Sequence, residues 1–205
     1  MAELKIYLCR HGESAGNVDG ILGGDSDLTT RGKDHAKNTA SFLADKQIEI
    51  VYFSPLKRSV QTAEIVREYI PSAKFIAQPA LIEIDYGCLD NLTIDEIRRR
   101  FPKEVKERRK DKYSWKLLDG ESYEDVDKRI QPFIEELKKK AGVYGIIAHR
   151  AVNKIILRRF HLSLESVLNR DIPHDCIFQI TYSEQNPFRG AIQQFISLDP
   201  EDSKI

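Results

Sequence analysis

Short apolar runs of strand length alternate along the chain with stretches whose apolar residues recur at helical spacing. The runs predict strands at residues 6–9, 48–53, 74–77 and 144–148. The intervening stretches predict helices at residues 33–44, 55–69, 93 onward, 122–141 and 152–160. Capping signals support two of the helix starts: Ser54 precedes Pro55, and Thr93 stands three residues before Glu96 as in a capping box.

Strands that alternate with helices predict an α/β fold, a three-layer sandwich whose mainly parallel central sheet has helices on both faces. The last apolar runs, residues 177–182 and 191–198, flank a polar turn with Asn186 and Pro187, which predicts a hairpin that includes an antiparallel edge strand. Ligands of such sheets bind beyond the carboxyl ends of the strands. Two basic pairs, Arg10-His11 and His149-Arg150, follow predicted strands, so we expect the site there.

Residues 90–121, which we call the basic excursion, interrupt the alternation of strands and helices. Between Arg98 and Lys116 the chain has ten Lys or Arg and three Asp or Glu, a net charge of +7. We interpret the excursion as a mostly helical lid over the site. A chain of 205 residues with 41% apolar content fits one domain, so we expect a single domain over residues 1–205 with the lid inserted at about 90–121.

Composition excludes several classes of partner. Lys and Arg balance Asp and Glu at 32 each, which argues against binding of nucleic acid or a membrane surface through the overall charge. The three cysteines lie far apart without CxxC spacing, which fits reduced thiols rather than disulfides or a zinc site. We find neither a signal peptide nor the ~20 apolar residues of a membrane span. We therefore expect a cytoplasmic protein, either a monomer or a homodimer.

The first candidate functional motif is Arg10-His11-Gly12-Glu13. It places a guanidinium beside an imidazole, and its glycine lets the backbone approach an anion such as phosphate. Phosphoryl transfer through a covalent intermediate needs a nucleophile, cations around the phosphoryl oxygens and an acid for the leaving oxygen. His11 is the candidate nucleophile. Arg10 and Arg58 are candidate phosphate ligands, because guanidinium presents paired donors. Glu83 is the candidate acid, and His149 is a second imidazole for the phosphoryl group.

These motifs, in this order, resemble the histidine phosphatase superfamily, which includes the cofactor-dependent phosphoglycerate mutases. The resemblance also uses Gln61-Thr62-Ala63 after Arg58 and Tyr86-Gly87 after Glu83. It implies that His11 is phosphorylated, that Glu83 protonates the leaving group, and that neither a metal nor a cofactor is needed. The residues that it implies as phosphoryl ligands are Arg10, Asn17, Arg58 and His149.

Within the superfamily, the chain is most similar to the fructose-2,6-bisphosphatase branch. The similarity includes residues 6–14, the Gly23-Gly24 loop, residues 83–85 and residues 111–125. It implies that Gly23 lines the phosphate-side loop. It also implies that a sugar and a second phosphate are bound by Arg108, Lys112 and Tyr123.

Three positions depart from that branch. Ile94 stands where the branch has a tyrosine that contacts substrate, Arg150 replaces a glutamine, and Lys154 replaces an arginine. The departures leave the phosphoryl residues intact and put the sugar specificity in question. Arg150 beside His149 favours an anionic substrate, such as one with a carboxylate, so we also count Arg150 among the candidate substrate-binding residues.

The predicted function is a metal-independent phosphatase that acts through a phosphohistidine on a phosphorylated sugar or similar small metabolite, with fructose 2,6-bisphosphate as the first candidate. One alternative is a phosphoglycerate mutase-type or broad-specificity phosphomonoesterase. The mutases' segment after the acid is replaced here by Ile84-Asp85 and residues 88–90, which favours hydrolysis. Another alternative is a non-catalytic phosphate-binding module.

Three further features fit a structural or surface role without any function in the site. His35 lies among charged residues, so we expect it at the solvated surface. His174 is expected in an ordinary loop, with a place in the pocket as the less favoured alternative. The Arg98-Arg99-Arg100 run fits either a solvated helix face or a substrate contact, and the sequence leaves that choice open.

Overall fold

The computed structural model describes residues 3–116, 119–160, 162–183 and 192–197, and its centre is a six-stranded sheet in the order β3-β2-β4-β1-β5-β6. β3, β2, β4 and β1 run parallel to one another, and β5 runs antiparallel to β1 and to β6. The sheet is mainly parallel with an antiparallel hairpin at one edge, as the apolar pattern predicted. The strands are β1 (Leu4–Arg10), β2 (Ile50–Phe53), β3 (Lys74–Ala77), β4 (Gly142–Ala148), β5 (Cys176–Tyr182) and β6 (Ile192–Ser197).

The hairpin prediction is confirmed by the pairing of β5 with β6, from Cys176 opposite Ser197 onward. Its turn, with Asn186 and Pro187, lies outside the described residues, and so do residues 198–205.

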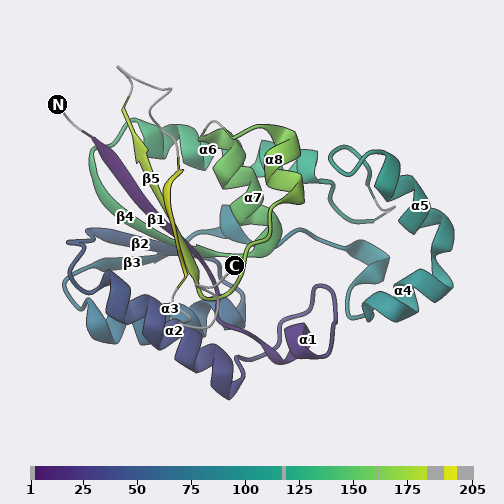
Figure 1. Ribbon diagram of the computed structural model, residues 1–205, viewed down its shortest axis with the longest axis horizontal. Coiled ribbons are helices and arrows are strands. Elements are labelled where there is room, and N and C mark those ends of the chain that lie inside the picture. Colours follow the sequence, from purple (N-terminus) through teal and green to yellow (C-terminus); the bar gives the residue numbers. More distant parts are fainter. Residues whose placement is uncertain (1–2, 117–118, 161, 184–191, 198–205) are drawn as a thin grey trace.

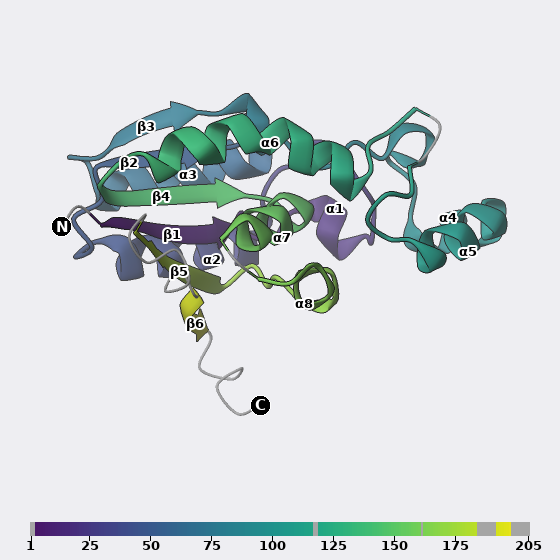
Figure 2. The same cartoon turned by 90° about the horizontal axis from the view of Figure 1, so that it is seen from above.

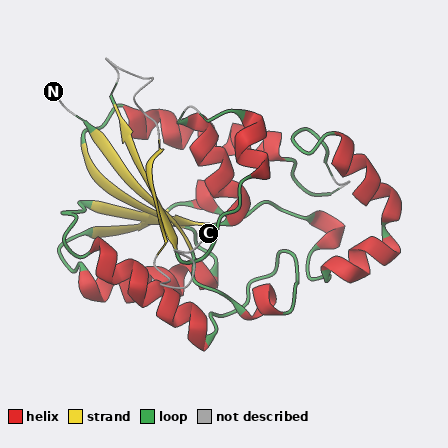
Figure 3. Ribbon diagram, viewed as in Figure 1, coloured by secondary structure: helices red, strands yellow, loops and turns green. Residues whose placement is uncertain are grey.

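Helices cover both faces of the sheet, which confirms the three-layer α/β sandwich (Figure 1). α2 (Thr30–Leu43) and α3 (Lys57–Tyr69) lie on one face. α6 (Tyr123–Lys138) and α7 (Arg150–Arg159) lie on the other, with α8 (Leu164–Asn169) beside α7. Figure 3 shows the same division between the yellow strands and the red helices.

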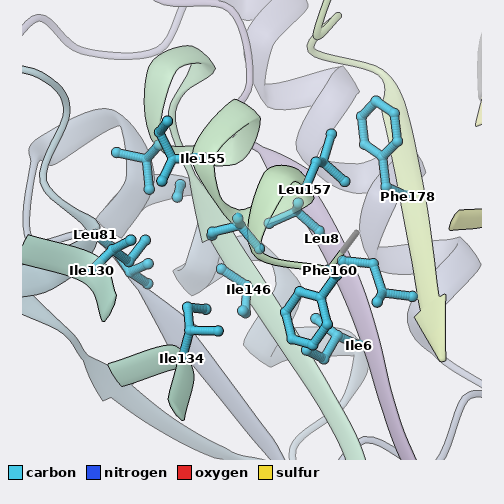
Figure 4. Close-up of a cluster of buried hydrophobic side chains, with 14 of the residues drawn as sticks. Ile6, Leu8, Leu81, Ile130, Ile134, Ile146, Ile155, Leu157, Phe160 and Phe178 are labelled. Carbon is cyan, nitrogen blue, oxygen red and sulfur yellow. The ribbon is translucent and has the colours of Figure 1, made fainter. Parts of the chain in front are cut away.

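The alternation of side chains along β1 produces two apolar cores. Ile6 and Leu8 point into a core with residues of α6 and α7, and Tyr7 and Cys9 point into a core with residues of α2 and α3. Period-two alternation is what a strand covered on both faces requires. Figure 4 shows Ile6, Leu8 and Ile146 in the first of these cores.

The helix boundaries agree with most of the capping signals. Thr93 caps α4 (Ile94–Arg100) in a capping box with Glu96, and Ser122 caps α6 in a box with Asp125. The prediction at Ser54 is wrong by two residues, since α3 begins at Lys57 after Leu56. The Ser54 hydroxyl lies 2.7 Å from His149 Nε2, so a tertiary contact displaces its predicted local role.

The basic excursion stands apart from the sheet and is helical, as expected. It holds α4 and α5 (Pro102–Lys110), which project beyond the carboxyl ends of β1 and β4 in Figure 2. A small apolar cluster around Leu89 and Ile97 holds it together. Backbone hydrogen bonds from Leu22 to Leu92 and from Asn91 to Leu22 tie it to the loop after α1 (Ala15–Val18). Its closure as a lid stays a prediction.

Two short 3₁₀ helices, Pro79–Leu81 and Gly87–Leu89, connect β3 to the excursion. Among the described residues, no helix is both long enough and apolar enough to pass through a membrane.

The sheet order brings three loops to one edge. Arg10 of β1 is level with Ala148 of β4, and Phe53 of β2 is level with Ile147 of β4. Because these three strands are parallel neighbours, the residues that follow them meet at their carboxyl ends. Those residues are His11, Ser54 and His149.

Candidate active site

His11 and His149 share one buried site at this edge of the sheet. Their ring centroids are 4.9 Å apart with an angle of 55° between the planes. Only 2% of His11 and none of His149 is exposed. The two imidazoles, 138 positions apart in the sequence, are therefore in contact, and the prediction that they converge is correct in its geometry.

A hydrogen bond to backbone fixes the tautomer of His11. Nδ1 lies 2.7 Å from the Gly12 carbonyl oxygen, and because a carbonyl only accepts, Nδ1 carries the proton. Nε2 is then the nitrogen with a free lone pair, and Arg58 Nε donates to it at 3.1 Å. Burial, and after it the charges of His149 and Arg10, lower the pKa of His11 well below its usual value. His11 is therefore a neutral base near pH 7, as a nucleophile requires.

Gly12 is required here by close packing. A Cβ on Gly12 would lie 2.1 Å from the Gly32 carbonyl oxygen in the first turn of α2. The backbone of the strand end and that of the helix are thus in direct contact. The Gly12 N–H donates to Thr62 Oγ1 at 3.1 Å, so the peptide after His11 is held on both sides.

Arg58 joins the nucleophile to the Gly23-Gly24 loop. Its Nη1 donates to the Gly24 carbonyl at 2.8 Å, and the side chain is buried. Gly23 has a φ of +65°, and a Cβ there would lie 1.8 Å from Asp90 Oδ1 of the excursion. Only glycine fits this position. Gly23 lies in the loop beside the site, where the resemblance placed it.

His149 is the residue immediately before α7 and contacts Ser54. Its Nε2 lies 2.7 Å from Ser54 Oγ. Ser54 Oγ accepts from the Leu56 N–H at 3.4 Å. If Ser54 donates its own proton to Nε2, the His149 proton stays on Nδ1, which has no partner among the described residues. Burial, followed by Arg58 and Arg10, lowers the pKa of His149 well below its usual value.

Glu83 lies at the N-terminus of α7, between the two arginines. Its Oε1 accepts from the backbone N–H of Ala151 at 3.2 Å and of Ile84 at 3.0 Å. A carboxylate at a helix N-terminus is stabilised by the helix dipole. The charge of Glu83 also opposes the effect of burial on the pKa of Arg10 and of Arg58. Glu83 therefore lies near both arginines of the site, and its role as the acid stays a prediction.

Arg10 and Asn17 are each held by a hydrogen bond to backbone. Arg10 Nη1 donates to the Ile172 carbonyl at 2.9 Å, and its Nε is buried without a partner in the described part of the chain. Burial lowers the pKa of Arg10 to about 10, so it stays cationic at neutral pH. Asn17 closes the cap of α1, because its Oδ1 accepts from the Ser14 N–H at 3.0 Å. Its amide nitrogen donates to no group in the described residues.

A cavity of about 340 Å³ lies between the helices of the excursion and the start of α6, where Tyr123 lines it. A second cavity of about 280 Å³ adjoins it and reaches Ala151, whose N–H bonds Glu83. Arg108, Lys112 and Tyr123 line both cavities, and Arg150 and Lys154 line the second. We call the space that these five residues line the cationic cavity. Each of the five was named in the sequence analysis, either as a candidate substrate contact or as a departure from the fructose-2,6-bisphosphatase branch. The structure brings them together beside the candidate phosphoryl ligands.

Two lysines of the cationic cavity share one acceptor. Lys112 Nζ and Lys154 Nζ donate to the Leu168 carbonyl oxygen at 2.7 Å and 2.9 Å. Lys154 is 2% exposed. Burial, and after it the charges of Lys112 and Arg150, lower the pKa of Lys154 to about 8. Arg150 is paired with Asp171 at 3.1 Å.

The Arg98-Arg99-Arg100 run was left between a solvated helix face and a substrate contact, and the structure separates its first member from the other two. Arg98 lines the second cavity, next to Ile94, and also pairs with Asp95 at 3.1 Å. Arg99 and Arg100 line neither cavity. A substrate contact is thus available to the first arginine of the run.

Two interpretations were wrong or incomplete. His35 is not at the surface: it is 8% exposed and its ring stacks on His174, with centroids 6.0 Å apart. Its buried neighbours at helical spacing, Gly32 and Thr39, were the signal that could have shown this. His174 contacts the site, since its ring centroid lies 5.2 Å from that of His11. The contact of Ser54 with His149 was missed, because the local sequence gives Ser54 a sufficient role as a helix cap.

The described residues contain no cluster of three or more side chains of the kind that bind a metal ion. The polar groups of the site are instead imidazoles, guanidiniums and one carboxylate, which suit an anion better than a cation.

Comparison with known families gives one match over most of the chain. The family model described as the histidine phosphatase superfamily (branch 1) matches residues 6–191. Among curated proteins, the chain is 40% identical over 157 residues to 6-phosphofructo-2-kinase/fructose-2,6-bisphosphatase 4 of Rattus norvegicus. It is 41% identical over 157 residues to 6-phosphofructo-2-kinase/fructose-2,6-bisphosphatase 1 of Homo sapiens. Each alignment covers 76% of this chain and 32% of the relative, so the chain spans about a third of their length.

Solved structures share the fold. Bacillus stearothermophilus YhfR matches with a TM-score of 0.78 and 25% identity, over 95% of each chain. The alpha-ribazole phosphatase of Shigella flexneri matches with a TM-score of 0.78 and 24% identity, over 88% of this chain and 92% of that one. A phosphoglycerate mutase from Bacillus anthracis gives a TM-score of 0.76 and 19% identity, over 96% and 92%.

Proposed function

The chain belongs to the histidine phosphatase superfamily (branch 1), and from this premise we propose that it hydrolyses a small phosphorylated metabolite with a second anionic group, through a phosphohistidine on His11. Fructose 2,6-bisphosphate is the first candidate substrate. The enzyme class, a phosphoric monoester hydrolase, follows from the family and its phosphatase members. The substrate and the role of each residue are the proposal.

The main observation behind the proposal is the tautomer of His11, which leaves the lone pair on Nε2. Its Nδ1–H is bound by the Gly12 carbonyl, so Nε2 presents a lone pair in a site that also contains Arg58 and His149. A phosphoryl group that approaches Nε2 would replace Arg58 Nε as the partner of that lone pair. Arg58, Arg10 and His149 would then bind the phosphoryl oxygens.

In the proposed first step, His11 Nε2 attacks phosphorus and the bond to the leaving oxygen breaks. The bound phosphate is an anion beside Glu83 and favours the protonated carboxyl group, which gives its proton to that oxygen, and the product leaves as an alcohol. Positive charge that develops on the imidazole is stabilised by the Nδ1–H bond to Gly12. In the second step, Glu83 takes a proton from water, the water oxygen attacks phosphorus, and the bond from phosphorus to Nε2 breaks. Phosphate leaves and His11 returns to its neutral form.

The cationic cavity supports a substrate with two anionic groups. Arg108, Lys112, Arg150 and Lys154 line the space that adjoins Glu83, and the carboxylate paired with one of them is Asp171. Arg98 and Arg109 also line this space, and an anion there would offset the mutual repulsion of the six cations. The curated relatives that are about 40% identical are named for fructose-2,6-bisphosphatase activity, which makes that sugar bisphosphate the first compound to test.

A phosphate-release panel tests the substrate. It includes sugar bisphosphates, sugar monophosphates, phosphoglycerates, phosphoserine and nucleotides, each compared by kcat/KM. We expect fructose 2,6-bisphosphate to exceed fructose 6-phosphate, because only the bisphosphate fills both anion sites. Equal kcat/KM values for the two would contradict the second anion site. Interconversion of phosphoglycerates with a bisphosphate primer, faster than phosphate release, would show a mutase instead.

A further inference from the structure

Beside the phosphoryl residues lies an imidazole to which the proposed chemistry gives no role. His174 Nδ1 lies 2.7 Å from the backbone carbonyl oxygen of His11. Because a carbonyl oxygen only accepts, the His174 Nδ1 carries a proton and donates it. Burial lowers the pKa of His174 to about 3, so the ring is neutral at working pH and adds no charge next to the nucleophile.

This bond completes the support of the nucleophile's backbone. The His11 N–H donates to the Ala148 carbonyl at 3.0 Å. The Gly12 N–H donates to Thr62 Oγ1, and the Gly12 carbonyl accepts from His11 Nδ1. The carbonyl of His11 is the remaining polar group of this stretch, and its donor is His174. The peptide between His11 and Gly12 therefore has a partner on each side, and it directly precedes the Gly12 carbonyl that fixes the His11 tautomer.

The segment that carries His174 holds Arg10 as well. β5 begins two residues later and pairs antiparallel with β1, with Ile177 opposite Cys9. The chain just before β5 thus passes the end of β1, where the Ile172 carbonyl accepts from Arg10 Nη1 at 2.9 Å. One short segment contacts both a phosphoryl ligand and the nucleophile.

The His174 ring is itself held by packing. The ring of His35 from α2 stacks on it at an angle of 12°, and the ring of His11 lies at 60° to it. His35 is buried. A ring held between two others keeps its orientation, which a directional hydrogen bond to His11 requires.

We infer that His174 is a positioning residue for the nucleophile: its Nδ1–H bond to the His11 carbonyl holds the His11 backbone, and with it Nε2, on the line of attack on phosphorus. The inference rests on the proposed role of His11. His174 does not touch the phosphoryl group in this account, so its loss acts on the rate of transfer more than on the binding of phosphate.

Three substitutions at one position separate the hydrogen bond from the ring. The side-chain nitrogen of His174→Asn is as many bonds from Cβ as Nδ1 of histidine, whereas that of His174→Gln is one bond farther. His174→Ala has no donor. The rate constant of phosphoenzyme formation is measured by rapid quench with fructose 2,6-bisphosphate or, should the panel prefer another compound, with that one. The dissociation constant of inorganic phosphate and the melting temperature are measured beside it.

We expect His174→Ala and His174→Gln to slow phosphoenzyme formation by about 10–100-fold, because small misplacements of reacting groups have effects of this size, and His174→Asn to stay within about threefold of the wild type. Phosphate affinity should change little in all three. His35→Phe, which keeps a flat ring against His174, is the matched control and should react at the wild-type rate.

Equal rates for His174→Asn and His174→Gln would overturn the inference, and they remain comparable if His174→Ala fails to fold. A wild-type rate in His174→Ala would overturn it too. The proposed function is tested separately: phosphoenzyme in His11→Ala would remove His11 as nucleophile, whereas its absence there together with unaffected His174 variants would reject the role of His174 alone.

Discussion

The phosphoryl centre and the cationic cavity beside it hold their polar groups in different ways. In the centre, His11, His149 and Glu83 are each tied to backbone or to a buried hydroxyl at the ends of parallel strands or at the start of α7. In the cavity, Arg108 and Lys112 come from the excursion, which stands outside the sheet (Figure 2). Lys112 and Lys154 share a single carbonyl acceptor.

From this difference we expect the centre to determine the rate of the reaction and the cavity to determine the preference among substrates. The centre is set by strand order and by packed backbone, so the same centre can serve many phosphate esters. The cavity depends on Lys112 and on side chains of α5, α6 and α7, all of which lie outside the sheet. Substitutions in the centre should therefore change the rate on every substrate, and substitutions in the cavity should change the preference among substrates.

The largest effect that tests this comparison is expected at Glu83. Glu83→Gln removes the proton for the leaving oxygen, so kcat on fructose 2,6-bisphosphate should fall by about 10²–10⁴-fold. An activated aryl phosphate needs little protonation and should lose far less. Steady-state phosphate release on both compounds gives the ratio, and equal losses would count against an acid role for Glu83.

A smaller and substrate-dependent effect is expected in the cavity. Arg108→Ala should raise KM for the bisphosphate by about 10-fold, an amount typical for loss of one charged contact to an anion. Activity on the aryl phosphate, which has no second anionic group for Arg108 to bind, should stay near the wild-type value. Arg99→Ala, a change at an arginine that lines neither cavity, is the matched control. A similar loss on both substrates would show that the two regions are not separable.

The sequence predicted the centre from its own pattern of residues, whereas it predicted the cavity mainly through the resemblance to a family. The alternation of Ile6 and Leu8 with Tyr7 and Cys9 predicts a strand covered on both faces, and parallel strands bring His11 and His149 to one edge. Of the cavity residues, Arg108, Lys112 and Tyr123 came from the resemblance, whereas Arg150 was added for its charge beside His149. Ser54, His35 and His174 were misread because their roles depend on partners about 95, 139 and 163 positions away, and no local pattern encodes such partners.

The smallest expected effect is a pH dependence of binding. The pKa of Lys154 is lowered to about 8, so its positive charge is present below that pH and is lost as the pH rises through it. KM for the bisphosphate should therefore rise between about pH 7 and pH 9, by severalfold. Lys154→Arg, whose guanidinium stays charged over this range, should flatten the profile. An unchanged profile in Lys154→Arg would assign the dependence to another group.

The most direct test of the central claim, that His11 Nε2 accepts the phosphoryl group, is a rapid-quench experiment with substrate labelled in the transferred phosphate. The account predicts a phosphoenzyme that is labile in acid and stable in base, whose label maps to His11 and is missing in His11→Ala. Full turnover by His11→Ala, or label on a residue other than His11, would contradict it.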